Sequence, residues 1–308
     1  MISIFITSRV KDNINSNIEK LVNSLIKYST SIDNFELLIK YDSDDDKAHK
    51  KIDFLKSINI NFKYIFGEKN RGYIDIHKGY NSLIPLASNN SLLFTCFADD
   101  FEICLNNWDS KLIDLVKKIN SEYFIIHQRP HPPTSRLSFF KIKYYPFYDI
   151  NNFSDLYIID EAPMWSPKLI KTIGSFGGVS FTDAYTLYIE NILSNKYKMN
   201  MTYFTKKEVI YRNLNKNVDS EIAPRWLTDR KYNFDYINSD KFKDDTEFEV
   251  KKIILALNKN LFFFYKSRYL FYAMMIYIDQ ILSITIYLKN KLITFLKNII
   301  KKRYYDKN

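Results

Sequence analysis

Short apolar segments alternate with amphipathic segments over residues 2–129, and this alternation restricts the folds open to the chain. Five segments rich in β-branched and aromatic residues are predicted as strands, over residues 2–7, 35–42, 61–67, 91–100 and 122–129. The segments between them carry apolar residues at helical spacing, over residues 14–29, 48–58, 73–87 and 108–119. Strands that alternate with helices in this way predict a Rossmann-like α/β fold with a mostly parallel central sheet.

Composition excludes several kinds of site. The chain has 308 residues and only six glycines, so a glycine-rich phosphate loop of the Walker type is excluded. Its two cysteines, Cys96 and Cys104, have neither the number nor the spacing of a zinc site or a disulfide framework. We expect a buried Cys96 thiol and a reducing compartment. The N-terminal segment reads as a first strand rather than a signal peptide, which predicts a cytoplasmic protein.

Polar side chains stand where the predicted parallel strands end. Because ligands of such sheets bind at the carboxyl ends of the strands, we expect these residues to converge on one crevice. They are Ser8 and Arg9 after the first strand, Asp42 at the end of the second, residues 67–71 after the third, and Asp99 and Asp100 after the fourth.

The adjacent carboxylates of Asp99 and Asp100 allow two interpretations. They can hold a Mg²⁺ or Mn²⁺ ion whose other ligands are waters or phosphate oxygens, and such an ion stabilises a departing diphosphate. They can equally form a solvated turn. Neighbouring residues on an extended segment point opposite ways, so one carboxylate is expected on the metal and the other on a hydroxyl. Trp108 is expected to begin the next helix and to pack beside this site.

Further candidates lie near the other strand ends. Asp42 is placed to accept hydrogen bonds from a base or ribose, and Arg71 to pair with a phosphate. The acids that follow Asp42, at residues 44–46, are expected to complement the dipole of the next helix. His77 is expected to be an ordinary surface or core histidine.

A general base is expected after the glycines at residues 174–178. Asp183 starts a predicted helix there and suits this role, although the position also fits a plain helix-start acid. Asp160 and Glu161 are competing candidates for the base. His127 and His131 are candidates for a metal ligand or a substrate contact.

The C-terminal part of the chain differs from the rest. We place a domain boundary near residue 240, between a catalytic domain over residues 1–240 and a basic, aromatic-rich helical segment over residues 241–308. Its longest uncharged run, residues 269–278, is too short to span a bilayer. Two interpretations stay open: amphipathic helices on an anionic membrane surface, or helices that pack on the catalytic domain or on a second copy.

Four segments, taken in order, resemble the family 2-like glycosyltransferases with the GT-A fold, and the resemblance covers roughly residues 2–190. The segments are "ISIFITSR", "FELLIKYDSDDD", "NRGYIDIHKGYN" and "FTCFADDFEICLNNWD". The resemblance implies a GT-A sandwich in which Thr7, Ser8, Arg9 and Asp42 contact the nucleotide.

The same resemblance assigns the remaining roles. It implies that Asp99 and Asp100 form a DxD-type pair for Mn²⁺ or Mg²⁺ and the sugar diphosphate. The segment "GSFGGVSFTDAYTLYIENIL" is similar to the acceptor side of the family, which makes Asp183 the catalytic base of an inverting transfer. The chain departs from the family pattern in having "ADDF" in place of a three-position DxD motif, so either aspartate can be the metal ligand.

Three functions follow as hypotheses. The first is an inverting glycosyltransferase that uses a nucleotide-diphosphate sugar, with UDP-sugar as the first guess. Its acceptor would be a saccharide or lipid-linked hydroxyl in surface polysaccharide or glycolipid synthesis, and the protein would sit on the inner face of a membrane or form a homo-oligomer. The second is a metal-dependent nucleotidyltransferase, and the third is a non-enzymatic basic adaptor for membrane or nucleic acid.

Overall fold

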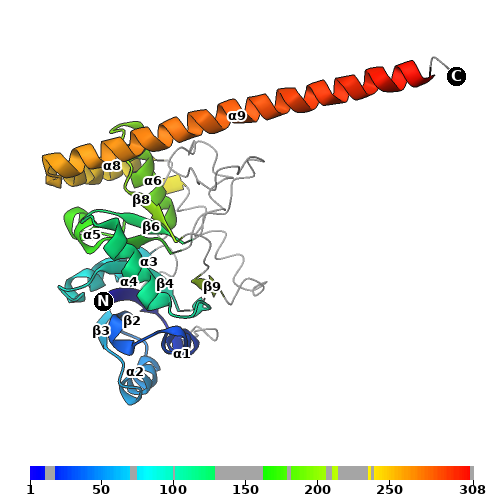
Figure 1. Cartoon of the computed structure of the whole chain (residues 1–308). Coiled ribbons are helices and arrows are strands. Elements are labelled where there is room, and N and C mark those ends of the chain that lie inside the picture. Colours follow the sequence, from blue (N-terminus) through cyan, green and yellow to red (C-terminus); the bar gives the residue numbers. More distant parts are fainter. Residues whose placement is uncertain are drawn as a thin grey trace.

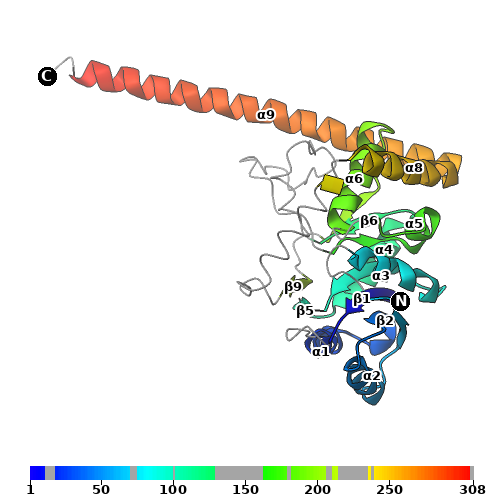
Figure 2. The same cartoon turned by 180° about the vertical axis from the view of Figure 1, so that it is seen from behind.

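A computed structural model gives the structure of the chain, and Figures 1 and 2 show it from opposite sides. It describes residues 1–10, 18–69, 75–99, 101–128, 162–178, 182–205, 210–213, 235–236 and 239–305.

Seven strands form the central sheet of the described chain, in the order β3-β2-β1-β4-β7-β6-β8. Their bounds are β1 (Ile2–Ser8), β2 (Phe35–Asp42), β3 (Phe62–Gly67), β4 (Leu93–Ala98), β6 (Ile125–His127), β7 (Met164–Trp165) and β8 (Thr202–Phe204). β1 is parallel to β2 and β4, β2 to β3, and β6 to β8. Only β7 is antiparallel to its neighbours, β4 and β6. The predicted, mostly parallel α/β sheet is therefore confirmed.

Helices lie on both faces of this sheet (Figure 1). The helices of the described chain are α1 (Ile18–Tyr28), α2 (Ala48–Ser57), α3 (Ile76–Leu83), α4 (Trp108–Ile119), α5 (Pro167–Ile173), α6 (Thr182–Asn195), α8 (Asp240–Ala256) and α9 (Lys259–Tyr305), with 3-10 turns η1 (Ile32–Asn34) and η3 (Ile84–Leu86). A separate two-stranded antiparallel sheet pairs β5 (Phe101–Ile103) with β9 (Tyr211–Asn213).

The alternation of side chains along β1 divides the core into two clusters. Ile4 and Ile6 belong to the cluster that includes α1, α2 and α4. Phe5, which lies between them, belongs to the cluster that includes α3, α5, α6 and α8. Both faces of β1 are thus buried, which explains why its sequence is apolar throughout instead of alternating with polar residues.

The C-terminal helices begin on this second cluster. Phe242, Val250 and Ile253 of α8 are buried within it, whereas α9 runs on past the body of the molecule (Figures 1 and 2). Among the described residues, no helix is long and apolar enough to cross a membrane. The boundary near residue 240 stays a prediction.

Candidate active site

The carboxyl ends of four neighbouring parallel strands, β3, β2, β1 and β4, meet at one edge of the sheet. In the register of the ladders, Thr7 of β1 pairs with Ala98 of β4, and Ser8 pairs with Tyr41 of β2. Asp42, the next residue of β2, pairs with Gly67 at the end of β3. In the part of the chain that the structure describes, these strand ends therefore lie at the same edge of the sheet.

A side-chain hydrogen bond links the last residue of β1 to the residue that follows β4. The Ser8 hydroxyl donates to Asp99 Oδ2 at 2.8 Å, and the Asp99 side chain is only partly buried. The bond fixes one oxygen of the carboxylate that the sequence places in the DxD-type pair. Asp100 and Arg71, the other predicted residues of this edge, lie outside the described residues.

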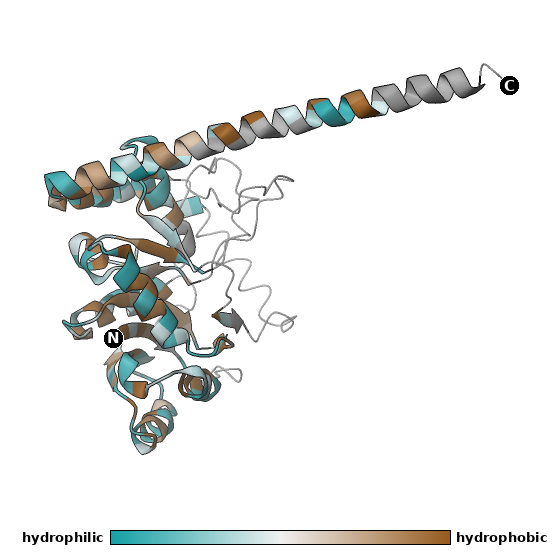
Figure 3. Ribbon diagram, in the orientation of Figure 1, coloured by the Kyte–Doolittle hydropathy of each residue, from teal (hydrophilic) through white to brown (hydrophobic). Residues whose placement is uncertain are grey.

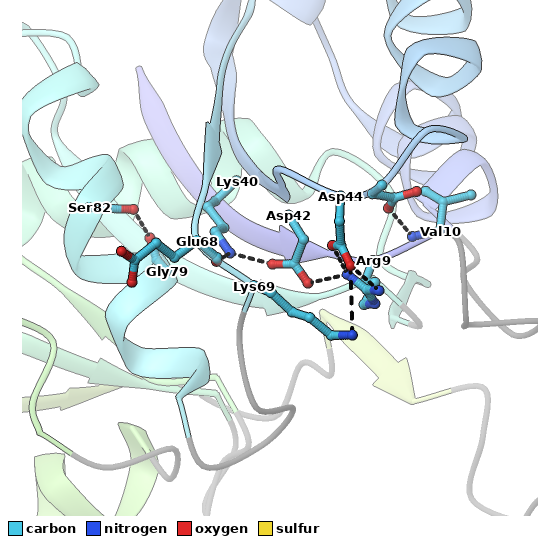
Figure 4. Close-up of polar contacts among 10 residues, drawn as sticks. Arg9, Val10, Lys40, Asp42, Asp44, Glu68, Lys69, Gly79 and Ser82 are labelled. Atoms are coloured by element: carbon cyan, nitrogen blue, oxygen red, sulfur yellow. Dashed lines mark hydrogen bonds and ion pairs between the residues drawn. The ribbon is translucent and has the colours of Figure 1, made fainter.

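Asp42 is buried at the end of β2 and is held by two cations (Figure 4). Arg9 Nη1 donates to Asp42 Oδ2 at 2.9 Å, and Lys40 Nζ donates to Asp42 Oδ1. Lys40 is itself buried and also donates to the carbonyl of Glu68 at 2.5 Å. A buried carboxylate is tolerated when it is paired and hydrogen-bonded in this way.

The acids after β2 contact the chain that follows β1 (Figure 4). Arg9 Nη2 donates to Asp44 Oδ2 at 3.0 Å, and Lys69 lies 3.6 Å from the same oxygen. The hydrogen bonds from Arg9 hold the pKa of Asp44 well below its usual value. Asp45 Oδ2 accepts a hydrogen bond from the backbone N–H of Val10 at 2.6 Å. Asp44 and Asp45 thus position Arg9 and Val10, contacts that were not predicted, while their predicted effect on the dipole of α2 stays a prediction.

Tyr41 lies beneath this cluster of acids. Its hydroxyl is buried and has no hydrogen-bond partner among the described residues. Burial raises the pKa of Tyr41, and the nearby charges of Asp99 and Asp45 raise it further.

The donor set at Asp99 suits a cation that a substrate helps to bind. No group of three or more metal-ligating side chains occurs among the described residues, so they contain no closed metal cage. Mg²⁺ and similar ions are commonly held by one or two carboxylates together with phosphate oxygens and waters. Asp99 supplies one such carboxylate, which fits a cation shared with a diphosphate.

Asn81 of α3 fixes the glycine segment that leads to α6. Its Oδ1 accepts from the backbone N–H of Phe176 at 2.7 Å, and its Nδ2 donates to the carbonyl of Gly177 at 3.1 Å. α6 begins at Thr182, so Asp183 stands in its first turn, as predicted. Only the backbone of Asp183 is described, and its proposed role stays untested.

Contacts from α6 and α8 surround the glycine segment. The Tyr185 hydroxyl donates to Glu249, which also accepts from the Ser175 hydroxyl at 3.2 Å. Burial raises the pKa of the Glu249 carboxyl. Residues from α3, the glycine segment, α6 and α8 together line a cavity of about 380 Å³, with His77 among them.

His127 has a buried partner. Its Nε2 lies 3.0 Å from both carboxylate oxygens of Glu190 on α6, and both side chains are almost fully buried. Glu190 also accepts from the Thr202 hydroxyl at 2.5 Å. This network joins β6, α6 and β8. His127, a candidate for a metal ligand or a substrate contact from the sequence, thus has a structural role here. His131, Asp160 and Glu161 lie outside the described residues.

The prediction that Trp108 packs beside the site is wrong. Trp108 begins α4 as expected, but its Nε1 donates to the carbonyl of Leu25, and its ring packs on Phe35 at the start of β2. That is the end of β2 opposite Asp42. Asp109 accepts from the backbone N–H and hydroxyl of Thr30 at 2.8 and 2.6 Å, so this pair anchors the turn before β2.

Neither a family model nor a curated protein matches the sequence. Several solved structures resemble the fold. The mannosyltransferase PcManGT from Pyrobaculum calidifontis, in complex with GDP-Man and Mn²⁺, has a TM-score of 0.51 at 11% identity, over 92% of this chain and 80% of that one. Residues 1–349 of S. aureus TarS give a TM-score of 0.48 at 16% identity, over 82% and 70%. The chain thus has a GT-A-like fold, as the resemblance of its sequence segments implied.

Proposed function

We propose that the protein transfers a sugar from a nucleotide-diphosphate sugar to a hydroxyl of a saccharide or lipid-linked acceptor, with inversion at the anomeric carbon. One observation carries the proposal: the ends of β1, β2 and β4 bring Ser8, Asp42 and Asp99 to a single edge of a GT-A-like sheet. This edge is where ligands of open α/β sheets bind.

In this proposal the strand ends bind the donor. Thr7, Ser8 and Arg9 line the nucleotide side, and the Asp42 carboxylate accepts from the base or ribose. Asp42 is already held by Arg9 and Lys40, so its position does not depend on the ligand. Arg71 would pair with the diphosphate. Such preorganisation limits the ordering entropy that binding costs.

Asp99 and Asp100 would hold Mn²⁺ or Mg²⁺ together with the diphosphate oxygens. When bound, the ion neutralises charge on the diphosphate leaving group. The Ser8 hydroxyl orients the Asp99 carboxylate for this task. PcManGT was solved with Mn²⁺, which makes manganese the first ion to test.

Asp183 would act as the general base. Its carboxylate takes the proton of the acceptor hydroxyl while that oxygen forms a bond to the anomeric carbon. The bond from the anomeric carbon to the diphosphate oxygen breaks in the same displacement, and its electron pair leaves with the nucleoside diphosphate. The backbone of α6 supports the proposal by placing Asp183 in the first turn after the glycine segment.

A thermal-shift screen of UDP- and GDP-sugars, with and without Mn²⁺, tests donor binding. We expect one nucleotide to raise the melting temperature only when Mn²⁺ is present, because a ligand that binds the native state stabilises it. Asp99→Asn should abolish the shift, whereas Asp183→Asn should keep the shift and abolish transfer. The exposed Asp114 of α4 provides a matched control, Asp114→Asn. Asp99→Asn and Asp183→Asn variants with normal transfer would eliminate the proposal.

A further inference from the structure

The first turns of α9 are fastened to the body of the protein. Tyr265 is fully buried, its hydroxyl donates to the carbonyl of Tyr123, and its carbonyl accepts from the N–H of Asn200 at 3.2 Å. One turn later, Arg268 Nη2 donates to the carbonyl of Thr202 at 2.9 Å, and its guanidinium lies 3.9 Å from the Tyr203 ring centroid. These contacts fix the direction in which the helix leaves the body.

Beyond this anchor, the described side chains of the helix are not covered by other described residues. From Met274 to Thr294, every side chain that the structure describes is exposed. At 1.5 Å per residue, the segment from Met274 to Tyr305 is about 48 Å long. Figures 1 and 2 both show it projecting away from the sheet and its helices.

Most of the exposed large apolar residues that the structure describes on α9 form one stripe, whereas Phe264, Tyr287 and Ile293 lie on other faces of the helix. The spacing within the stripe alternates among three, four and seven residues, which keeps its members on one face of a helix. The stripe consists of Phe263, Leu270, Met274, Tyr277, Ile281, Leu288 and Leu292, each more than half exposed. Phe271 and Ile278 widen it on one side, and Figure 3 shows brown segments recurring along the projecting helix.

The stripe faces away from the body. At 100° per residue, Tyr265 and Arg268 point to one side of the helix, and the stripe is centred about 180° from them. A flat surface laid on the stripe would therefore touch α9 along its length without meeting the sheet domain.

The charge of α9 is almost entirely positive. Its single acidic residue is Asp279, against nine basic ones. The basic residues are Lys259, Lys266, Arg268, Lys289, Lys291, Lys297, Lys301, Lys302 and Arg303. Lys289 and Lys291 are exposed, and by helical spacing they flank the stripe on opposite sides. Lysines in this position can extend their ammonium groups toward phosphates while their stems cover apolar surface.

We propose that the exposed stripe of α9 lies on an anionic lipid bilayer, parallel to the membrane plane. The apolar side chains enter the boundary between headgroups and acyl chains, and the lysines contact anionic headgroups. A second copy fits the helix less well, since pairing two such helices would bring two strongly positive segments together without acids to offset them. The inference does not depend on the proposed glycosyl transfer.

Flotation of the full-length protein with vesicles tests the proposal. We expect the protein to bind vesicles of phosphatidylcholine that contain about 30% phosphatidylglycerol and to bind vesicles of phosphatidylcholine alone only weakly. High salt should release it from the anionic vesicles. Leu270→Gln with Leu288→Gln should weaken binding by about a hundredfold or more, because two leucine side chains no longer enter the apolar boundary of the bilayer. Leu92→Gln, at an exposed leucine of the body, should leave binding unchanged.

A second pair of variants isolates the charge. Lys289→Gln with Lys291→Gln should lower the affinity for anionic vesicles by about thirtyfold, since both lysines lose their attraction to the anionic surface. Lys117→Gln with Lys118→Gln removes the same charge from exposed positions of α4 and should have little effect. Because all four lysines are exposed, we expect these variants to fold normally.

Two results would overturn the proposal. One is equal binding to anionic and neutral vesicles, or no binding to either. The other is a dimer in light scattering that the leucine variants dissociate while vesicle binding is absent, which would assign the stripe to a second copy.

Discussion

The Ser8 hydroxyl donates to Asp99 Oδ2 at 2.8 Å, and this bond joins the end of β1 to the end of β4. Two residues that are 91 positions apart thus share one edge of the sheet. The next residue, Arg9, donates from Nη1 to Asp42 Oδ2 at 2.9 Å. The end of β1 therefore connects the proposed metal side of the site to its proposed nucleotide side.

Ser8→Ala should lower the rate of Mn²⁺-dependent sugar transfer by about tenfold, because a hydrogen bond to a charged group contributes roughly 1.5–3 kcal/mol. The fold should survive, since the hydroxyl lies at the edge of the sheet and not within the core. Initial rates at several Mn²⁺ concentrations measure the effect. Ser110→Ala is the control, because the Ser110 hydroxyl donates to the carbonyl of Asn107 at the start of its own helix, far from the carboxyl ends of the strands. Equal rates for both variants would contradict a role for Ser8.

Lys40→Met should destabilise the protein by about 3–5 kcal/mol, since it leaves the buried Asp42 carboxylate without one of its two cations. Urea unfolding followed by circular dichroism gives the free energy. Lys56→Met is the matched control, because Lys56 and Asp53 are 3.9 Å apart and both exposed. Its effect should stay within about 1 kcal/mol. A loss of similar size in both variants would show that Asp42 does not need Lys40.

Glu36 should make the stability of the protein depend on pH below its ordinary pKa. Burial alone would raise the pKa of Glu36, but hydrogen bonds from Ser3 and Ser88 and the charge of Lys63 outweigh it, so the pKa is lowered. A lowered folded pKa means stability that is present above the unfolded pKa and lost as the pH falls through the folded value.

Urea unfolding at pH 6 and at pH 3.5 measures this contribution. The wild type should lose more free energy of unfolding than Glu36→Gln between these two values, because the variant has no proton to take up. Glu19→Gln is the control, since the Glu19 carboxylate is more exposed than that of Glu36 and pairs with Lys51 at 2.7 Å. Parallel losses in the wild type and in Glu36→Gln would refute the assignment.

The positions of Ser8, Asp42 and Asp99 could be predicted because each lies at the carboxyl end of a parallel strand. Ligands bind at that end whatever the order of the strands in the sheet. Lys40 was missed, although a lysine inside the apolar segment "FELLIKYD" is itself a signal of a buried ion pair. Asp44 has a specific partner in Arg9, which dipole reasoning along the chain does not reveal because the partner comes from another strand.

Other features depend on contacts that periodicity does not encode. β7 consists of Met164 and Trp165 alone, and it is a strand only because β4 and β6 pair with it on both sides. The site of Trp108 was misjudged for a similar reason. Its partner Phe35 lies at the amino end of β2, and the sequence of α4 does not show where that helix starts relative to the sheet.

Gly177→Ala should both destabilise the protein and slow the proposed transfer. Gly177 has a φ of 108°, and a Cβ there would lie 2.6 Å from Cγ of the buried Tyr185 ring. The backbone strain costs roughly 1–3 kcal/mol, and overpacking against the ring adds about 1–3 kcal/mol. Because Tyr185 is two residues after Asp183 on α6, a displaced ring should shift the first turn of that helix.

Gly174→Ala separates these two effects. Gly174 has a comparable φ of 91°, but a Cβ there would have no neighbour within 4 Å. This variant should show the strain cost alone and keep its transfer rate, whereas Gly177→Ala should lose more stability and several-fold in kcat. Equal losses of both stability and rate in the two variants would mean that packing against Tyr185 does not position α6. A loss of stability alone in Gly177→Ala would separate the packing of Tyr185 from the geometry of Asp183.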